Sequence, residues 1–238
     1  MAKQKINICW FRRDLRLHDN AALYHALKDG LPVVPIFIFD KAILDKLEDK
    51  TDRRIEFIHN AITDMQQQLQ SMGSSMEVYH GFPADVFAKL VEKYSINKVF
   101  TNHDYEPYAQ QRDTAIQHQL NDAGVSFHTF KDQVIFEKDE VLKDDGKPYT
   151  VFTPYSRKWK AKVNDFYLKS YPVEEYATNF YKQAPVEIPS LKEMGFEPVG
   201  LPFPSAETRK EIIKDFQEIG YKVECKILNS ADFGVPQV

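Results

Sequence analysis

Apolar and polar residues along the first 136 positions form a pattern that predicts strands and helices in turn. Five short apolar runs are typical of buried strands, and the clearest of them is VVPIFIF. Between these runs, apolar residues recur every three or four positions, which places them on one face of a helix. The predicted strands are 6–11, 33–39, 76–79, 98–101 and 125–130, and the predicted helices are 21–28, 55–72, 83–94 and 115–123.

The alternation of strands and helices predicts the fold class. Parallel strands joined by right-handed crossovers carry helices on both faces of the sheet. We therefore expect an α/β fold, with a five-stranded parallel sheet in a Rossmann-like arrangement. Pro35 is unusual inside the second run, because it has no N–H to donate to a neighbouring strand.

The pattern changes after residue 136. Residues 137–205 are rich in charge, tyrosine and proline, and only 155–167 has the spacing of a helix. A long segment with so little periodicity usually wraps a surface or leads to another domain. We expect an α/β domain over 1–136, an extended connector with one or two helices over 137–210, and a separate tail over 211–238.

Composition narrows the class of protein. The 238 residues have a net charge of −4, two cysteines and no apolar run of membrane-spanning length. Arg12 and Arg13 come too early for a signal peptide to precede them. A duplex-DNA-binding domain usually has a basic face, so we expect DNA to bind weakly if at all. These features are typical of a cytoplasmic protein with no membrane partner.

Three loops that follow predicted strands carry the most unusual chemistry: 11–20, 39–41 and 102–108. In open parallel sheets, ligands bind beyond the carboxyl ends of the strands. Guanidinium, carboxylate and aromatic groups together suit a flat, conjugated, hydrogen-bonding ligand. Alternatively, arginine and aspartate in such loops pair with each other and cap helices, and the residues alone favour this second interpretation.

Other chemical motifs are absent from the sequence. It has no glycine-rich phosphate loop, no nucleophile elbow, and no histidines at metal-ligand spacing. The basic run at 157–162 is better explained as a solvated helix face than as a phosphate contact. The sequence therefore assigns no catalytic residue and no metal site.

The run WFRRDLRLHDN at 10–20 resembles the opening signature of the DNA photolyase and cryptochrome family. PIFIFD at 35–40, NHDYEPY at 102–108 followed by Arg112 and Asp113, and VFTPY at 151–155 with Trp159 agree in order and spacing. The resemblance covers residues 5–205. It implies a five-stranded α/β domain that holds a light-harvesting antenna chromophore.

In that family, a helical domain follows and binds FAD and the pyrimidine dimer. None of its motifs occurs in this sequence, so FAD is expected only in that absent flavin-binding domain, which would be the partner of this chain. The family activity is that of a deoxyribodipyrimidine photo-lyase, and we expect this chain alone to be inactive.

The resemblance also suggests which antenna is bound. Family members that bind a deazaflavin resemble this chain at five charged positions, whereas folate-binding enzymes of the enterobacterial type carry Asn-Glu where this chain has Tyr108 and Ala109. We therefore expect a deazaflavin ahead of folate or FMN. The candidate cofactor-binding residues are Arg13, Asp14, Phe39, Asp40, Asp104, Glu106 and Tyr108.

Residues 220–238 resemble a different family, the DNA cytosine-5 methyltransferases, around a Gly-Val-Pro-Gln element. The catalytic Pro-Cys motif and the glycine-rich cofactor segment of those enzymes are absent, so Cys225 is better explained as an inert thiol. The sequence thus predicts the antenna-binding domain of a photolyase. The alternative is a stand-alone α/β nucleotide-binding or interaction module without photochemistry.

Overall fold

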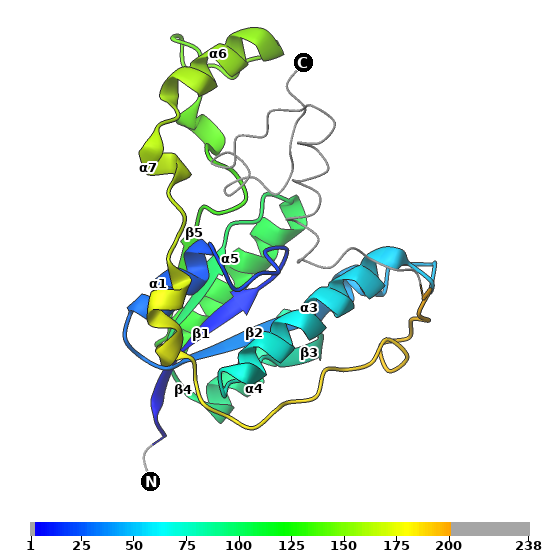
Figure 1. Ribbon diagram of the computed structural model, residues 1–238. Coiled ribbons are helices and arrows are strands. Elements are labelled where there is room, and N and C mark those ends of the chain that lie inside the picture. The colour runs from blue at the N-terminus through cyan, green and yellow to red at the C-terminus, as the bar shows by residue number, and fades with distance from the viewer. Residues whose placement is uncertain (1–2, 201–238) are drawn as a thin grey trace, which may run out of the picture. The chain divides into compact units, whose positions relative to one another are not determined.

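The computed structural model describes residues 3–200, and they contain the predicted parallel sheet. Its five strands lie in the order β3-β2-β1-β4-β5, and all neighbours are parallel (Figure 1). The predicted α/β fold class is confirmed. The strands are β1 (Lys5–Phe11), β2 (Val33–Asp40), β3 (Glu77–Gly81), β4 (Ser95–Asn102) and β5 (Ser126–Phe130).

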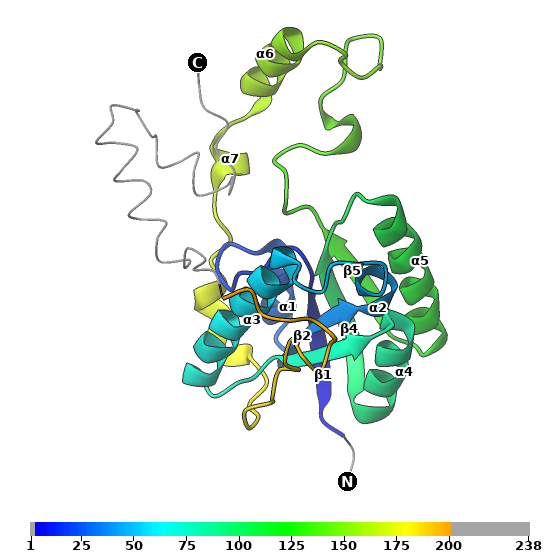
Figure 2. The same ribbon diagram turned by 90° about the vertical axis from the view of Figure 1, so that its right-hand side faces the viewer.

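Helices cover both faces of the sheet (Figure 2). Helices α1 and α3 pack on one face, α4 and α5 pack on the other, and the short α2 follows β2 directly. The bounds are α1 (Ala21–Lys28), α2 (Lys41–Leu44), α3 (Arg53–Ser71), α4 (Pro83–Lys93) and α5 (Pro107–Asp122).

The helix starts follow from local chemistry. Asn20 caps α1, because its side chain accepts the backbone N–H of Leu23 at 3.0 Å. Pro83 and Pro107 occupy the first turns of α4 and α5, where a missing N–H costs nothing. The helix predicted from residue 115 begins at Pro107, since its first two turns are mostly polar and carry no apolar periodicity.

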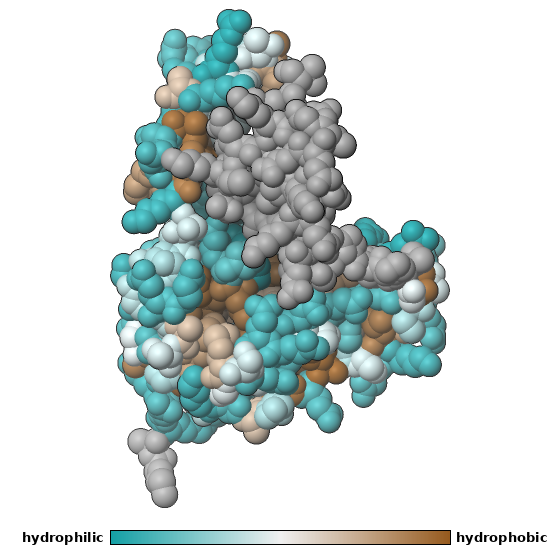
Figure 3. All heavy atoms as spheres, viewed as in Figure 1, coloured by the Kyte–Doolittle hydropathy of each residue, from teal (hydrophilic) through white to brown (hydrophobic). Residues whose placement is uncertain are grey.

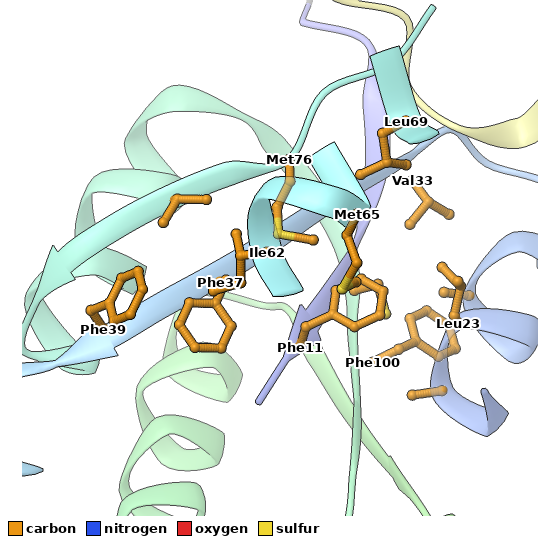
Figure 4. Packing of buried hydrophobic residues seen from close by; sticks show 14 of the residues in the cluster. Phe11, Leu23, Val33, Phe37, Phe39, Ile62, Met65, Leu69, Met76 and Phe100 are labelled. Carbon is orange, nitrogen blue, oxygen red and sulfur yellow. The ribbon is translucent and has the colours of Figure 1, made fainter. Parts of the chain in front are cut away.

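The core between the sheet and helices α1 and α3 includes several phenylalanine side chains among mostly aliphatic ones. Phe37 and Phe39 of β2 lie close together, with ring centroids 4.9 Å apart. Figure 4 shows them in one layer with Phe11 of β1 and Ile62 of α3. All four are buried, so this layer fixes β1 and β2 under α3.

Pro35 is tolerated because of its place in the sheet. The Val33 carbonyl accepts the N–H of Tyr181, so odd-numbered residues of β2 direct their backbone groups away from β1. Pairing with β3 begins only at Ile36 and Glu77. The missing N–H of Pro35 therefore falls just before the ladder to β3 starts.

Residues 171–200 form a segment, here named the strap, that belongs to the same compact unit as residues up to Asp132. Its side chains Val173, Phe180 and Met194 are buried in the core beside α1 and α3. The strap passes along α3 in Figure 1, and its last amides, Val199 and Gly200, donate to the Glu56 carboxylate at 3.0 and 3.1 Å. Within the connector expected over 137–210, residues 171–200 therefore pack on the sheet domain.

Residues 133–170 form a second unit that is described by itself. It contains a 3-10 turn, η1 (Lys138–Glu140), and two helices, α6 (Phe152–Lys162) and α7 (Asp165–Leu168). The helix predicted over 155–167 is interrupted because Asn164 caps α7, accepting the Phe166 N–H at 3.0 Å. The rings of Trp159 and Tyr167 pack against Phe136.

The surface over α3 is mainly hydrophilic, and its apolar residues occur in small separate groups (Figure 3). Within residues 3–200, no helix has the length and apolar character required to cross a membrane. The predicted tail over 211–238, including Cys225, lies outside the described residues.

Candidate functional site

The predicted site residues lie at the carboxyl ends of β1, β2 and β4. The chain runs from β1 outward to β3 and then returns to the other side of β1 at β4, so the strand order reverses between β1 and β4. Ligands of open parallel sheets bind beside such a reversal. The loop after β1, helix α2 after β2 and the loop after β4 all meet at this carboxyl edge.

Asp14 is buried and holds the loop after β1 in place. Its carboxylate accepts the Arg12 backbone N–H at 2.8 Å and the side-chain amides of Asn20 and Asn102 at 3.0 and 2.6 Å. The Asn102 side-chain oxygen in turn accepts the Ala22 N–H at the start of α1. Asp14 therefore shapes the edge, and Asn102, which the sequence analysis did not assign, shares that role.

Asp40 and Tyr108 are brought together across the sheet. The Tyr108 hydroxyl donates to Asp40 Oδ2 at 2.7 Å, while Asp40 Oδ1 accepts the Ala42 N–H and caps α2. Burial raises the pKa of Tyr108, and the hydrogen bond to the Asp40 carboxylate raises it further. The phenol therefore remains protonated and links α5 to the end of β2.

Arg112 lies one helical turn after Tyr108 and joins the same group. Its Nη1 is 3.8 Å from Asp40 Oδ2, and its Nη2 is 3.0 Å from Asp113 Oδ1. Its guanidinium carbon also lies 5.8 Å from the Tyr108 ring centre and 4.9 Å from that of Trp10. The spacing of four between Tyr108 and Arg112 places both on one helix face, which is a signal that could have identified Arg112.

Arg13, Asp104 and Glu106 form a second, more open group at the same edge. The Arg13 guanidinium is 3.9 Å from Asp104 and 3.6 Å from Glu106. The Arg13 and Glu106 side chains are 57% and 62% exposed, whereas that of Asp104 is 9% exposed. Loose, solvated pairs of this kind contribute little stability and can exchange partners with a ligand.

Phe39 is placed differently from the other predicted residues. It is 3% exposed and lies in the core layer beneath α3, where Phe37 is its nearest aromatic neighbour. Its side chain therefore belongs to the core, and its main contribution to the edge is to fix the strand that ends at Asp40.

His80 is an edge residue that the sequence analysis missed. It lies beside Phe39 at the end of β3, and its Nε2 is buried without a hydrogen-bond partner. Burial lowers the pKa of His80, the Lys41 charge lowers it further, and Asp45 opposes this shift. A neutral imidazole with an unpartnered buried nitrogen is a candidate contact for a polar ligand atom.

The described residues contain no cluster of three or more His, Cys, Asp or Glu side chains that could hold a metal ion. The edge instead offers one phenol–carboxylate pair, two ionic groups and aromatic rings. The aromatic rings can stack on a planar molecule, and the polar and ionic groups can orient that molecule by hydrogen bonds.

Comparison with known proteins identifies the family to which this fold belongs. The family model described as DNA photolyase matches residues 7–175, which is more than half of the chain. The chain belongs to the DNA photolyase family. It matches the deoxyribodipyrimidine photo-lyase of a Synechococcus species at 30% identity over 206 residues, covering 84% of this chain and 42% of that protein. Cryptochromes are also among the relatives of this photolyase domain.

Two solved structures of photolyases are similar to this one. A bacterial class III photolyase from Agrobacterium tumefaciens is 24% identical, with a TM-score of 0.69 over 92% of this chain and 42% of that chain. An archaeal photolyase from Sulfolobus tokodaii is 25% identical, with a TM-score of 0.57 over 75% of this chain and 42% of that chain. The chain therefore spans less than half the length of these photolyases, and it corresponds to their N-terminal domain.

A second family model, described as C-5 cytosine-specific DNA methylase, matches residues 201–238. This match is short and weak, and it falls on residues that the structure does not describe. It agrees with the resemblance seen in the tail sequence.

Proposed function

We propose that this photolyase domain binds a light-harvesting antenna chromophore at the carboxyl edge of its sheet, in support of light-driven repair of pyrimidine dimers. The observation that carries the proposal is the group of Asp40, Tyr108 and Arg112 beside the reversal of strand order. Two elements that are distant in sequence, β2 and α5, place an aromatic ring, a carboxylate and a guanidinium together there. Such groups can hold a flat ligand in one orientation.

The second group supports the same conclusion from its exposure. Arg13 and Glu106 are the solvent-facing ionic groups of the edge, and their separation of 3.6 Å is longer than a good hydrogen bond. A ligand with a carbonyl or phosphate group can replace Glu106 as the partner of Arg13. Asp14 holds the loop that carries Arg13, so the site is shaped before the ligand arrives.

A deazaflavin or another flavin-like chromophore fits this edge better than a folate. The archaeal photolyase of known structure is described as holding two FAD molecules, with the implication of a novel light-harvesting cofactor. Folate-binding relatives use side chains at the positions of Tyr108 and Ala109, but Ala109 is buried and the Tyr108 hydroxyl is bonded to Asp40. FMN and FAD share a flat tricyclic ring with deazaflavin and remain candidates beside it.

The role of the domain would be passive. It holds the chromophore rigidly and away from water, so that the excitation passes to a flavin in the helical domain that the family uses for catalysis. That helical domain is the proposed partner of this chain. The chain of 238 residues, tested alone under blue light, is expected not to repair dimers, and light-dependent repair by the purified chain would contradict this.

Titration with chromophores tests the proposed function. Purified protein is mixed with deazaflavin, FMN, FAD or a reduced folate, and absorbance and fluorescence are recorded. We expect saturable one-to-one binding of at least one tricyclic chromophore, with a shifted absorption band. Tyr108→Phe should weaken this binding, whereas Tyr94→Phe, a phenol at the opposite end of the sheet, should not. If none of the four chromophores binds, the alternative of an interaction module is favoured.

A further inference from the structure

Trp10 has an unusual electrostatic environment at the end of β1. It is buried and packs edge-on against Phe87. The guanidinium carbons of Arg12 and Arg112 lie 5.1 and 4.9 Å from its ring centre. Its indole N–H is buried without an acceptor. One tryptophan ring is thus in cation–π contact with two guanidinium groups.

Arg112 also lies between Trp10 and the proposed chromophore site. The same guanidinium is 4.9 Å from the Trp10 ring centre and 5.8 Å from that of Tyr108. Tyr108 in turn is bonded to Asp40, so Arg112 contacts both Trp10 and the other two members of the group that would hold the ligand.

Carboxylates offset part of this positive charge. Asp113 accepts from Arg12 at 2.6 Å and from Arg112 at 3.0 Å, and Asp40 is 3.8 Å from Arg112. Guanidinium N–H groups point outward in the plane of the guanidinium. The carboxylates therefore lie beside the cations, while the faces of the cations remain available to the indole ring.

This arrangement matters because tryptophan is readily oxidised. An excited flavin-like chromophore can take one electron from a nearby indole, which leaves an indole radical cation and a chromophore radical anion. Return of the electron restores both molecules, but the excitation is lost as heat. Two cations against the ring disfavour the radical cation, and the unpartnered N–H offers no acceptor to which it could lose a proton.

We propose that Arg12 and Arg112 make Trp10 a poor electron donor and so protect the excited antenna chromophore from quenching by the protein itself. The proposal rests on the proposed function of the carboxyl edge and gives Arg112 a second role there. In this role Arg112 acts through Trp10 and not by contact with the ligand.

Fluorescence lifetimes of bound chromophore test the proposal. With FMN or deazaflavin at saturation, Arg112→Gln is expected to shorten the lifetime of the bound fraction by about twofold or more, because one of the two cations against the Trp10 ring is lost. Arg112→Lys, which keeps the charge, should stay near the wild-type lifetime. Adding Trp10→Phe to Arg112→Gln should restore the lifetime. An unchanged lifetime in Arg112→Gln, or a shortened one that Trp10→Phe does not restore, would overturn the proposal.

A second measurement needs no bound chromophore. In a Trp159→Phe background, Trp10 is the one remaining tryptophan of the chain. Flash-generated tris(bipyridine)ruthenium(III) takes one electron from the indole, and the radical yield is read by transient absorption. Arg112→Gln should raise this radical yield, and Arg112→Lys should not. If circular dichroism shows that the glutamine variant is unfolded, Arg112→Met takes its place. An equal Trp10 radical yield in all variants refutes the proposal, even if the chromophore titration has succeeded. A raised radical yield in Arg112→Gln, together with no chromophore binding, contradicts only the proposed function.

Discussion

The two ends of the sheet use the same pair of groups, a phenol and a buried carboxylate, in different settings. At the amino end, Glu77 of β3 accepts the hydroxyls of Tyr79 and Tyr94 and lies 2.7 Å from the Lys93 ammonium. At the carboxyl end, Asp40 accepts the hydroxyl of Tyr108. Both carboxylates are almost fully buried.

The difference lies in what surrounds each pair. Glu77 has three donors from side chains around it, and these bind β3 and α4 into one closed cluster. Asp40 lies 3.8 Å from Arg112. The same end of the sheet also carries the loosely paired Arg13 group and, on the neighbouring strand, His80 with its unpartnered nitrogen. A phenol–carboxylate pair alone therefore does not mark a ligand site. The open ionic groups and orphaned polar atoms at the carboxyl end are what support the proposed ligand site there.

Removing the charge at the amino end should have the largest effect on stability. Glu77→Gln leaves Lys93 and two phenols facing a neutral, differently shaped partner, and we expect the free energy of unfolding to fall by about 2–4 kcal/mol. Urea unfolding followed by circular dichroism measures this. Chromophore affinity of the folded variant should equal that of wild type, and a weaker affinity would show that the two ends are not independent.

The matched tyrosine variants should separate the two ends directly. Tyr108→Phe removes one hydrogen bond to a carboxylate at the proposed site, and we expect the dissociation constant for chromophore to rise by about tenfold. Tyr94→Phe removes the equivalent bond at the amino end and should cost about 1–2 kcal/mol of stability without affecting the dissociation constant. Equal losses of affinity in both variants would remove the distinction between the ends.

The smallest expected effect is a dependence of stability on pH. Burial lowers the pKa of His80 from its ordinary 6.5, so folding favours the neutral imidazole. This contribution is fully present above about pH 6.5 and is lost as the pH falls through the lower, folded pKa. Unfolding curves between pH 7.5 and about 5 should therefore decline less steeply for His80→Gln than for wild type. Parallel declines would mean that His80 is not involved.

Much of the fold could be predicted because local patterns determine it. All five strands overlap their predicted ranges, and β1 and β2 are continuous apolar runs because both of their faces are covered. The strap was not recognised because its buried residues, such as Val173, Phe180 and Met194, are spaced irregularly and become buried only against α1 and α3. The start of α5 was missed because its first turns, beginning at Pro107, carry no apolar stripe.

The site was predictable in position and less so in detail. Loops after β1, β2 and β4 could be named from sequence, because parallel strands end at one edge. Which side chains meet there depends on strand order and helix rotation. Asp40 and Tyr108 lie at the edge where their loops were expected and bond to each other there, whereas the side chains of Asp14 and Phe39 are buried. Arg112, named from the sequence only as part of the family signature, joins Asp40 and Tyr108.

The central claim is that the carboxyl edge holds the chromophore. At the amino end, a shallow pocket of about 240 Å³ is lined by residues that include Gln4, Pro32, Asn179 and Lys182, and it offers a rival location on the same domain. Amide chemical-shift mapping by NMR, with and without saturating FMN or deazaflavin, distinguishes the two. We predict shifts concentrated at residues 12–14, 40–45, 80–82 and 104–112. Shifts confined to residues around Gln4, Pro32 and 178–182 would contradict the account.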